Sequence, residues 1–469
     1  MTDLHCDVAI IGAGTAGLAA ERAARKAGAS TLLIDDRFAG TTCATVGCMP
    51  SKLLIAAAHV AHAVRTAPIF GIGAQEPAID GVAVMARVRK ERDAFVAATI
   101  EAIDRIPDGI RQRTRARFVD ATTLLLDDGH RIQAKAIVIA TGSRPTVPPM
   151  FAALGDRVLS NENIFELTDL PRSVAVVGAG PIGLELAQAL VRLGVVVEVF
   201  DRSERLAALH DDAVMAELQA ILSRELPFHL AVSIAVERQG GAVKLAWTGK
   251  SSGEKIFDYV LVATGRPPEL KGLDLAATGL ALDEHGTPEF SRETMQCGQS
   301  SIFLAGDADA DRTVLHEASA EGAIAGRNAA SFPNVEPAAR GPAFSIMFTD
   351  PPVAVLGKPA GPDSVIGCAS YADQGRAKVE ARNVGMARIY AERPDGRLVG
   401  AALVGPSMDH IAHLLAWAID RGETATALLE LPFYHPTLEE GIKSALRQIC
   451  AEVHTPLPRD RDEGAPAGG

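Results

Sequence analysis

The two residues with the clearest chemical potential are Cys43 and Cys48, in the segment GTTCATVGCMPSK at 40–52. Five residues of ideal helix rise about 7.5 Å, which exceeds the usual Cα separation across a disulfide of about 4.4–6.8 Å. A bridged pair therefore needs a backbone that departs from helix here, and Gly47 permits this. At a helix N-terminus the dipole lowers the pKa of a thiol, as a redox-active cysteine requires. The segment predicts a redox-active pair.

Structural roles for the cysteines are less favoured. Six cysteines in 469 residues are too few for a disulfide framework. Zinc needs more ligands than one pair, and no second CxxC motif or histidine cluster accompanies it. Two inert buried thiols remain as the other alternative, and we expect no metal site.

A candidate base lies near the end of the chain, where FYHPTLEE supplies His435 and Glu440. Alone, such a histidine is usually an ordinary loop residue. Thiol exchange, however, needs a group that deprotonates the incoming dithiol, and a carboxylate on the other ring nitrogen would orient that group. We therefore predict that His435 and Glu440 act together.

Two glycine-rich turns in the same context indicate two dinucleotide sites. Each follows a buried strand, opens a helix and has an acid 23 residues after its first glycine, at the end of the next strand. Backbone N–H groups and the helix dipole can then hold a pyrophosphate, and the acid can take ribose hydroxyls. The two sets, at a constant offset of 166 residues, are Gly12, Gly14, Gly17 and Asp35, and Gly178, Gly180, Gly183 and Asp201.

The flanking segments complete an α/β pattern. The segments IVIATGSRP and VLVATGRPP each run from a strand into a glycine turn, and SIFLAGDADA places Asp307 directly after a buried strand. Further strands and helices follow a Pro-rich stretch near 333–342, ending in a helix from about Leu438 to Val453. We predict an α/β fold with two Rossmann-like dinucleotide-binding domains and a C-terminal α+β domain.

Composition excludes several classes. A net charge of −12 disfavours nucleic acid as the main partner, because phosphate neutralisation needs clustered Lys and Arg. The N-terminus has no basic segment before its short apolar run, so we expect no secretory signal and a cytoplasmic protein. No stretch reaches 18 uninterrupted apolar residues, so we expect no transmembrane helix and no membrane partner.

Over roughly residues 5–450 the chain resembles the pyridine nucleotide-disulfide oxidoreductase family, and most of all its dihydrolipoamide dehydrogenase branch. The family typically reads GGTCxNxGCxPSK where this chain reads GTTCATVGCMPSK, so Thr41, Ala44 and Thr45 depart from the pattern. The implied domains are 1–147 (FAD-binding, with the disulfide), 148–269 (NAD-binding), 270–340 (FAD-binding and central), 341–455 (dimerisation) and a disordered tail, 456–469.

The resemblance also implies cofactors and roles. The first fold binds FAD and the second binds NAD. Cys48 is the flavin-proximal thiol, whose thiolate forms a charge-transfer complex with the flavin, and Cys43 is the interchange thiol. Lys52 lies beside flavin N5 and pairs with Glu185, whose alternative is a surface carboxylate paired with Arg192. The remaining implied contacts are Asp35 on the adenosine ribose, Asp307 on the ribityl chain, Thr42, Lys52, Thr141 and Gly142 with FAD, and Gly265 with NAD.

The HPTxxE motif of the family implies that His435 reaches the disulfide of the other subunit, so the protein works as a homodimer. Asp201 favours NAD over NADP, because a carboxylate binds the free 2′-hydroxyl, although Arg202 and Arg205 could accept a 2′-phosphate. We expect no C-terminal redox pair like that of mercuric and large thioredoxin reductases, since the tail has only Cys450.

The preferred substrate is a neutral, slender dithiol such as the lipoyl arm of a protein. Arg22 is a possible carboxylate-binding residue of the glutathione-type enzymes, and Tyr434 departs from the small residue common before the motif histidine. Reduction of another disulfide or of a metal substrate, a diaphorase or transhydrogenase, and a non-enzymatic flavin redox sensor remain the alternatives.

Overall fold

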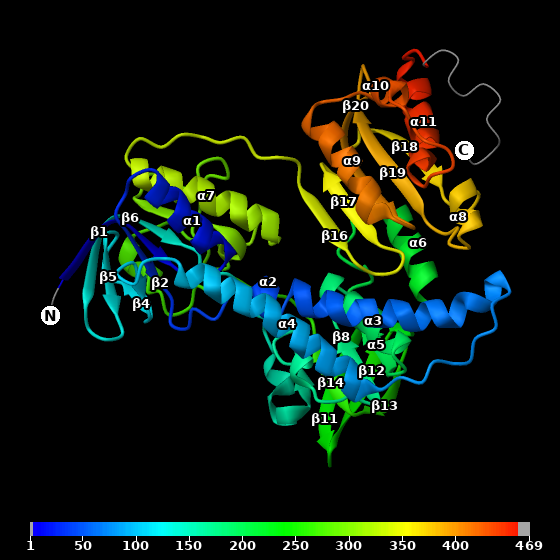
Figure 1. Ribbon diagram of the computed structural model, residues 1–469, viewed down its shortest axis with the longest axis horizontal. Coiled ribbons are helices and arrows are strands. Elements are labelled where there is room, and N and C mark those ends of the chain that lie inside the picture. Colours follow the sequence, from blue (N-terminus) through cyan, green and yellow to red (C-terminus); the bar gives the residue numbers. More distant parts are fainter. Residues whose placement is uncertain (1–2, 458–469) are drawn as a thin grey trace.

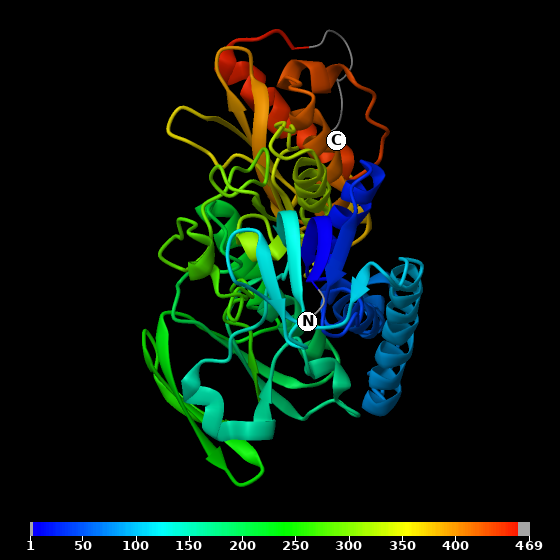
Figure 2. The ribbon, with the colours of Figure 1, turned by 90° about the vertical axis from the view of Figure 1, so that its left-hand side faces the viewer.

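The computed structural model describes residues 3–457 and has three main parts, built on a mixed, a parallel and an antiparallel sheet in turn (Figure 1). The predicted tail, 456–469, lies almost entirely outside the described residues. Figure 2 faces the first sheet, with the C-terminal part above it and the second sheet below.

The first part is a seven-stranded sheet in the order β3-β2-β1-β6-β5-β4, with β15 also paired to β6. The parallel pairs β1–β2, β1–β6 and β6–β15 bring the chain back to this sheet after residue 300. The strands are β1 (Asp3–Ile11), β2 (Thr31–Ile34), β3 (Arg111–Gln112), β4 (Ala116–Phe118), β5 (Thr123–Leu126), β6 (Arg131–Ile139) and β15 (Ile302–Leu304).

Helices α1 (Thr15–Lys26) and α7 (Leu315–Ser331) lie side by side on this sheet (Figure 1). Their approach depends on small residues. A Cβ on Gly322 would come within 2.1 Å of the Ala16 carbonyl oxygen, and one on Gly326 within 2.2 Å of that of Ala20. The alanine-rich sequence of α1 is thus explained by a close helix–helix contact.

The second part is a five-stranded parallel sheet in the order β10-β9-β8-β14-β7, covered by α5 (Pro181–Arg192) and α6 (Asp212–Leu222). A separate antiparallel sheet of β11 (Val232–Gln239), β12 (Ala242–Gly249) and β13 (Gly253–Phe257) packs beside it. The parallel strands are β7 (Val158–Leu159), β8 (Ser173–Val177), β9 (Val196–Phe200), β10 (Phe228–His229) and β14 (Tyr259–Val262).

The third part is an antiparallel sheet in the order β16-β17-β20-β19-β18, covered by helices. Its apolar core is one contiguous cluster around the buried residues of β17, β19, β20 and α9. The elements are β16 (Phe344–Met347), β17 (Val353–Gly357), β18 (Val365–Ser370), α8 (Gly375–Val379), β19 (Met386–Glu392), β20 (Arg397–Val404), α9 (Met408–Asp420), α10 (Ala425–Glu430) and α11 (Lys443–Val453).

The predicted C-terminal helix differs at its start. We predicted a helix from about Leu438, whereas α11 begins at Lys443 after a 3₁₀ turn, η6 (Glu439–Ile442). The reason is local, because the Glu440 carboxylate accepts the backbone N–H of Thr437 at 3.1 Å and tightens this turn.

Helices α2 (Thr42–Thr45), α3 (Cys48–Thr66) and α4 (Gly81–Asp104) join these parts. In Figure 1, α3 and α4 cross the front of the molecule from the first sheet toward the second. The stretch Thr42–Phe70, which includes η1 (Ala67–Phe70), is long and apolar enough to cross a membrane by length and composition alone. Its residue Lys52 forms an ion pair with α5, and α3 packs on α4 and α5, so we interpret α3 as a packing helix of this fold.

Candidate active site

Cys43 and Cys48 face each other across a break between two helices. Cys43 lies in α2, and Cys48 is the first residue of α3. Gly47 between them has φ −116° and ψ −116°, outside the helical region, and a Cβ there would lie 2.9 Å from the Thr42 carbonyl oxygen. The predicted departure from helix is therefore present. Both thiols are reduced and share a hydrogen bond.

The surroundings of this pair shift the pKa values of the two thiols in opposite directions. The hydrogen bond from Cys43, the positive charge of Lys52 and the backbone N–H at the start of α3 lower the pKa of Cys48 to about 6, against the effect of burial. The hydrogen bond to Cys48 and burial raise the pKa of Cys43. The two shifts run in opposite directions, so the pair favours the thiolate on Cys48 over that on Cys43.

Lys52 lies one turn further along α3 and binds the carboxylate predicted for it. Its Nζ lies 2.7 Å from Glu185 Oε2 of α5, and the exposed fractions of the two side chains are 33% and 8%. The other carboxylate oxygen, Oε1, accepts the backbone N–H of Phe348 at 2.7 Å. The alternative interpretation of Glu185 as a surface carboxylate paired with Arg192 is wrong, since Arg192 binds other acids.

His435 and Glu440 form the second predicted pair. His435 Nδ1 lies 3.0 Å from Glu440 Oε1, which also accepts the Thr437 N–H at 3.1 Å. The histidine side chain is 60% exposed and the glutamate only 2%. A buried carboxylate therefore orients an accessible ring. Within residues 3–457 His435 makes no hydrogen bond to either cysteine, and its neighbour Tyr434 is 82% exposed.

The first glycine turn has the shape needed for FAD. Gly12 has φ +105°, and a Cβ there would lie 2.4 Å from the Ala140 carbonyl oxygen. Gly14, the N-cap of α1, has open space around it and no side chain caps the helix, so the first N–H groups can donate hydrogen bonds to a pyrophosphate. The Thr141 hydroxyl, at the end of β6, is buried with no hydrogen-bond partner in the described chain. These residues fit the cofactor.

The second turn repeats this geometry for NAD. Gly178 has φ +112°, and a Cβ there would lie 2.3 Å from the Ala263 carbonyl oxygen. Gly180 is the N-cap of α5, again without a side-chain cap. Gly265, after β14, has φ +127° and open space around it. The residues at this turn fit a second dinucleotide.

The two acids at the ends of β2 and β9 have a role that the sequence did not reveal. Asp35 Oδ2 accepts the Ala13 N–H at 3.0 Å, and Asp201 Oδ2 accepts the Ala179 N–H at 2.6 Å. Each carboxylate therefore fixes its glycine turn to the neighbouring strand. The sequence feature that could have indicated this role is the constant spacing of 23 residues between the first glycine of each turn and its acid.

Two remaining predicted residues lie at the edges of the first turn. Asp307 Oδ2 accepts a hydrogen bond from the Ser143 hydroxyl at 2.8 Å, which joins the loop after β15 to the loop after β6. Ser143 was not predicted, although it follows Thr141 and Gly142 in the same segment. Thr42 is the exposed first residue of α2.

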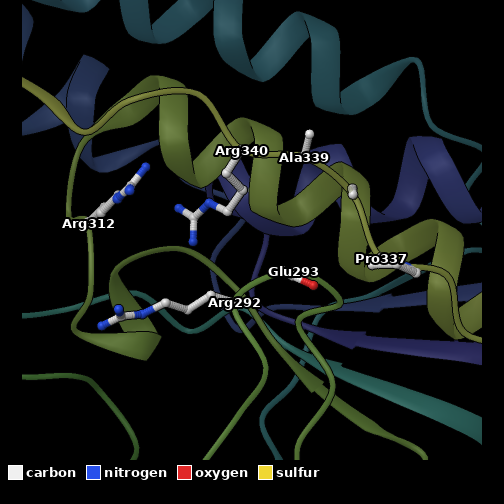
Figure 3. Close-up of a pocket in the computed structure, with 7 residues that line it drawn as sticks. Arg292, Glu293, Arg312, Pro337, Ala339 and Arg340 are labelled. Atoms are coloured by element: carbon white, nitrogen blue, oxygen red, sulfur yellow. The ribbon is translucent and has the colours of Figure 1, made fainter. Parts of the chain in front are cut away.

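A pocket of about 420 Å³ lies elsewhere, beside α7, where Arg292, Arg312 and Arg340 point into a common space (Figure 3). Carboxylates already neutralise these arginines. Arg312 and Arg340 bind Glu317 at 2.8 and 2.7 Å, and Arg292 binds Asp311 at 2.8 Å. The pocket contains none of the predicted site residues, and we do not assign it as the active site.

Comparison with known families agrees with this geometry. Residues 6–322 match the family described as pyridine nucleotide-disulphide oxidoreductase, and residues 343–446 match the dimerisation domain of the same family. The chain belongs to the pyridine nucleotide-disulphide oxidoreductase family. The predicted fold class, the oxidoreductase activity and the cofactors of the family, FAD and NAD(H), are thereby confirmed. The dimerisation domain indicates a homodimer, as predicted.

Individual relatives cover nearly the whole chain. Dihydrolipoyl dehydrogenase 3 of Pseudomonas aeruginosa is 30% identical over 96% of this chain and 98% of its own length. A mercuric reductase of Acidithiobacillus ferrooxidans is also 30% identical, over 96% of this chain and 83% of its own length. Among solved structures, LpdA from Mycobacterium tuberculosis superposes with a TM-score of 0.81 at 23% identity, covering 95% of this chain and 99% of that one. The fold is shared with all of them.

Proposed function

We propose that this protein oxidises a dihydrolipoyl dithiol, carried by a protein or free, through Cys43 and Cys48 and reduces NAD. The observation that supports this most strongly is the division of labour within the cysteine pair. Cys48, with a pKa of about 6, is a good leaving thiolate, while Cys43 is the thiol with the raised pKa.

The thiol chemistry starts from the oxidised pair. One substrate sulfur attacks Cys43 Sγ, the bond to Cys48 breaks, and Cys48 leaves as a thiolate. The second substrate thiol then attacks the sulfur of the first, so the substrate leaves as its disulfide and Cys43 as a thiol. Two electrons have moved from the substrate to the cysteine pair.

We assign His435 as the base of this exchange. It would take the proton of the attacking thiol, and Glu440 would hold the resulting imidazolium through Nδ1. Because His435 contacts neither cysteine of its own chain in the described residues, we propose that it serves the disulfide of the partner subunit. The dimerisation domain that carries it supports this arrangement.

Bound FAD supplies the two-electron chemistry that joins the cysteine pair to the nicotinamide. We infer that Gly12, Gly14 and Gly17 hold its pyrophosphate and that Asp307 meets its ribityl chain. Lys52 would lie beside the flavin ring, with Glu185 fixing its ammonium. The remaining proposed contacts are Asp35, Thr42, Thr141 and Gly142.

We infer that NAD is bound by Gly178, Gly180 and Gly183, with Gly265 alongside. The choice of NAD over NADP is supported by Arg205, which is already engaged by the Leu209 carbonyl oxygen at 2.7 Å and by Asp212 at 2.7 Å. That arginine is therefore not free to receive a 2′-phosphate, and Asp201 would repel one.

The test is NAD reduction by dihydrolipoamide with the FAD-loaded protein and its Cys48→Ser and His435→Gln variants. We expect steady turnover by the parent and a loss of at least about 100-fold in both variants, as for removal of a nucleophile or a general base. Glu439→Gln, at the half-buried neighbour of Glu440, is the matched control and should keep parental activity.

The same assay separates the alternatives. A parent that is inactive with dihydrolipoamide but oxidises NADPH in the presence of Hg(II) or another disulfide would contradict the lipoyl substrate. NADH oxidation with a dye acceptor that survives Cys48→Ser, in a parent inactive with dihydrolipoamide, would indicate a diaphorase. A single flavin reduction without turnover would indicate a redox sensor.

A further inference from the structure

One face of α5 connects the Lys52–Glu185 pair to the third part of the molecule. Glu185, Gln188 and Arg192 are spaced three and four residues apart, so they share a helix face. All three are buried, with exposed fractions of 7%, 3% and 4%. They meet the segment 348–350, which joins β16 to β17.

Gln188 and Arg192 fix the end of this segment at Asp350. The Gln188 amide pairs with the backbone of Asp350 in both directions, donating from Nε2 to the carbonyl oxygen at 2.8 Å and accepting the N–H on Oε1 at 2.7 Å. Arg192 Nη1 binds the Asp350 carboxylate at 2.8 Å. Arg192 is itself held by Glu225 through two contacts of 2.7 Å. Such buried charge-assisted contacts define one geometry.

Fixing Asp350 places Phe348 against the ion pair in two ways. Its N–H donates to Glu185 Oε1 at 2.7 Å, while Glu185 Oε2 binds Lys52. Its ring lies over the Lys52 ammonium, which is 4.5 Å from the ring centroid. The ammonium is thus bracketed by a carboxylate and the face of an aromatic ring, an arrangement that favours a localised cation.

We propose that Phe348 is a positioning residue, held in place by Gln188, that fixes the Lys52 ammonium relative to the Cys48 sulfur. This inference rests on the proposed roles of Lys52 and Cys48. It makes the docking of the dimerisation domain on α5 part of the redox site, since the segment belongs to that domain and not to the elements that carry the cysteines.

The physical consequence is electrostatic. The charged groups that act on Cys48 are Lys52 on its own helix and Glu185 on α5, together with the thiol of Cys43 on α2. Lys52 stabilises the thiolate and Glu185 opposes it. Without the ring, the ammonium keeps Glu185 but loses the aromatic face, so water reaches it, screens its charge and weakens its stabilisation of the thiolate.

The test titrates Cys48 in the Cys43→Ser holoenzyme, in which Cys48 has no disulfide partner. The readout is the long-wavelength absorbance of the thiolate beside oxidised flavin, followed against pH. Phe348→Leu should raise the midpoint by about 0.3–0.7 pH units. Phe348→Tyr, which keeps a ring, should leave the midpoint unchanged. The matched control is Phe344→Leu, which removes a ring at the start of β16 that packs against His316 and His413.

A second variant protects the test against a folding defect at Phe348. Gln188→Met preserves volume but removes both contacts to the Asp350 backbone, and it should raise the midpoint in the same direction. FAD content and the thermal midpoint are measured for every variant, and only those that match the parent in both are compared.

Lys52→Met in the Cys43→Ser protein separates the positioning role of Phe348 from the proposed role of Lys52. If it raises the midpoint and neither Phe348→Leu nor Gln188→Met does, the positioning role is wrong and the proposed function stands. If Lys52→Met itself leaves the midpoint unchanged, the proposed role of Lys52 is wrong, and the positioning role fails with it.

Discussion

The two dinucleotide repeats are alike where they face a cofactor and different where they face the rest of the molecule. In both, a glycine with positive φ lies against the carbonyl at the end of the neighbouring strand, and an acid fixes the turn from the next strand. The helices that follow these turns have opposite surroundings. Helix α1 packs on α7 through small residues, whereas α5 presents Glu185, Gln188 and Arg192 to another part of the chain.

Equivalent positions make the contrast explicit. At the offset of 166 residues, Glu185 corresponds to Ala19, a buried residue of α1. Ala19 carries no charge, whereas the glutamate at the equivalent place in α5 provides one for Lys52. The repeat thus supplies a turn and helix that can bind a dinucleotide, while a few buried positions on the helix decide which other parts of the chain it contacts.

The largest expected effect on cofactor binding comes from substituting the last glycine of each dinucleotide turn. Gly17→Val places its Cβ 1.8 Å from the Gly12 carbonyl oxygen, and Gly183→Val places it 2.0 Å from that of Gly178. We expect Gly17→Val to abolish FAD retention, while Gly183→Val keeps FAD but no longer reduces it with NADH. Flavin content and anaerobic reduction measure both. Loss of FAD in Gly183→Val would contradict the view that the two turns bind their dinucleotides independently.

A moderate effect is expected at the contact that only the first repeat has. Gly326→Ala directs a methyl group toward the Ala20 carbonyl oxygen, so α1 and α7 must separate. Overpacking of this kind costs about 1–3 kcal/mol, more than the helix propensity that alanine gains. Denaturant unfolding measures it. Gly109→Ala, with nothing within 4 Å, is the control, and equal stabilities would show that the contact relaxes without cost.

The smallest expected effect concerns the buried acids near the first repeat. Burial and the neighbouring Glu321 raise the pKa of Asp309 to about 8. Since an unfolded Asp titrates near 3.9, folding takes up a proton between these values, and this residue lowers stability as pH rises from about 4 to about 8. Asp309→Asn removes that dependence.

The thermal midpoint of Asp309→Asn should therefore exceed that of the parent above pH 8, by about 2–4 °C, and approach it near pH 4. A difference independent of pH would show that packing, and not ionisation, is responsible. The Cys48 titration should not change, because the buried acids of the first part contact neither cysteine in the described chain.

Much of the site followed from local pattern. The glycine turns, the helix break at Gly47 and the His435–Glu440 contact each depend on residues close in sequence, where backbone geometry leaves few alternatives. Predictions that depended on distant partners were incomplete. The pairing of Glu185 with Lys52 came from resemblance, and the alternative partner, Arg192, binds Glu225 and Asp350 instead.

The sequence by itself determined the two glycine turns and the helix break that brings Cys43 and Cys48 together, because spacing and glycine content restrict the backbone locally. Only the tertiary structure decided what surrounds them. Phe348 lies 163 residues from Glu185 along the chain, and no periodicity predicts that its N–H and ring complete the Lys52 site. Long-range contacts of this kind depend on how separately folded cores pack together, and the sum of many weak apolar contacts fixes that packing.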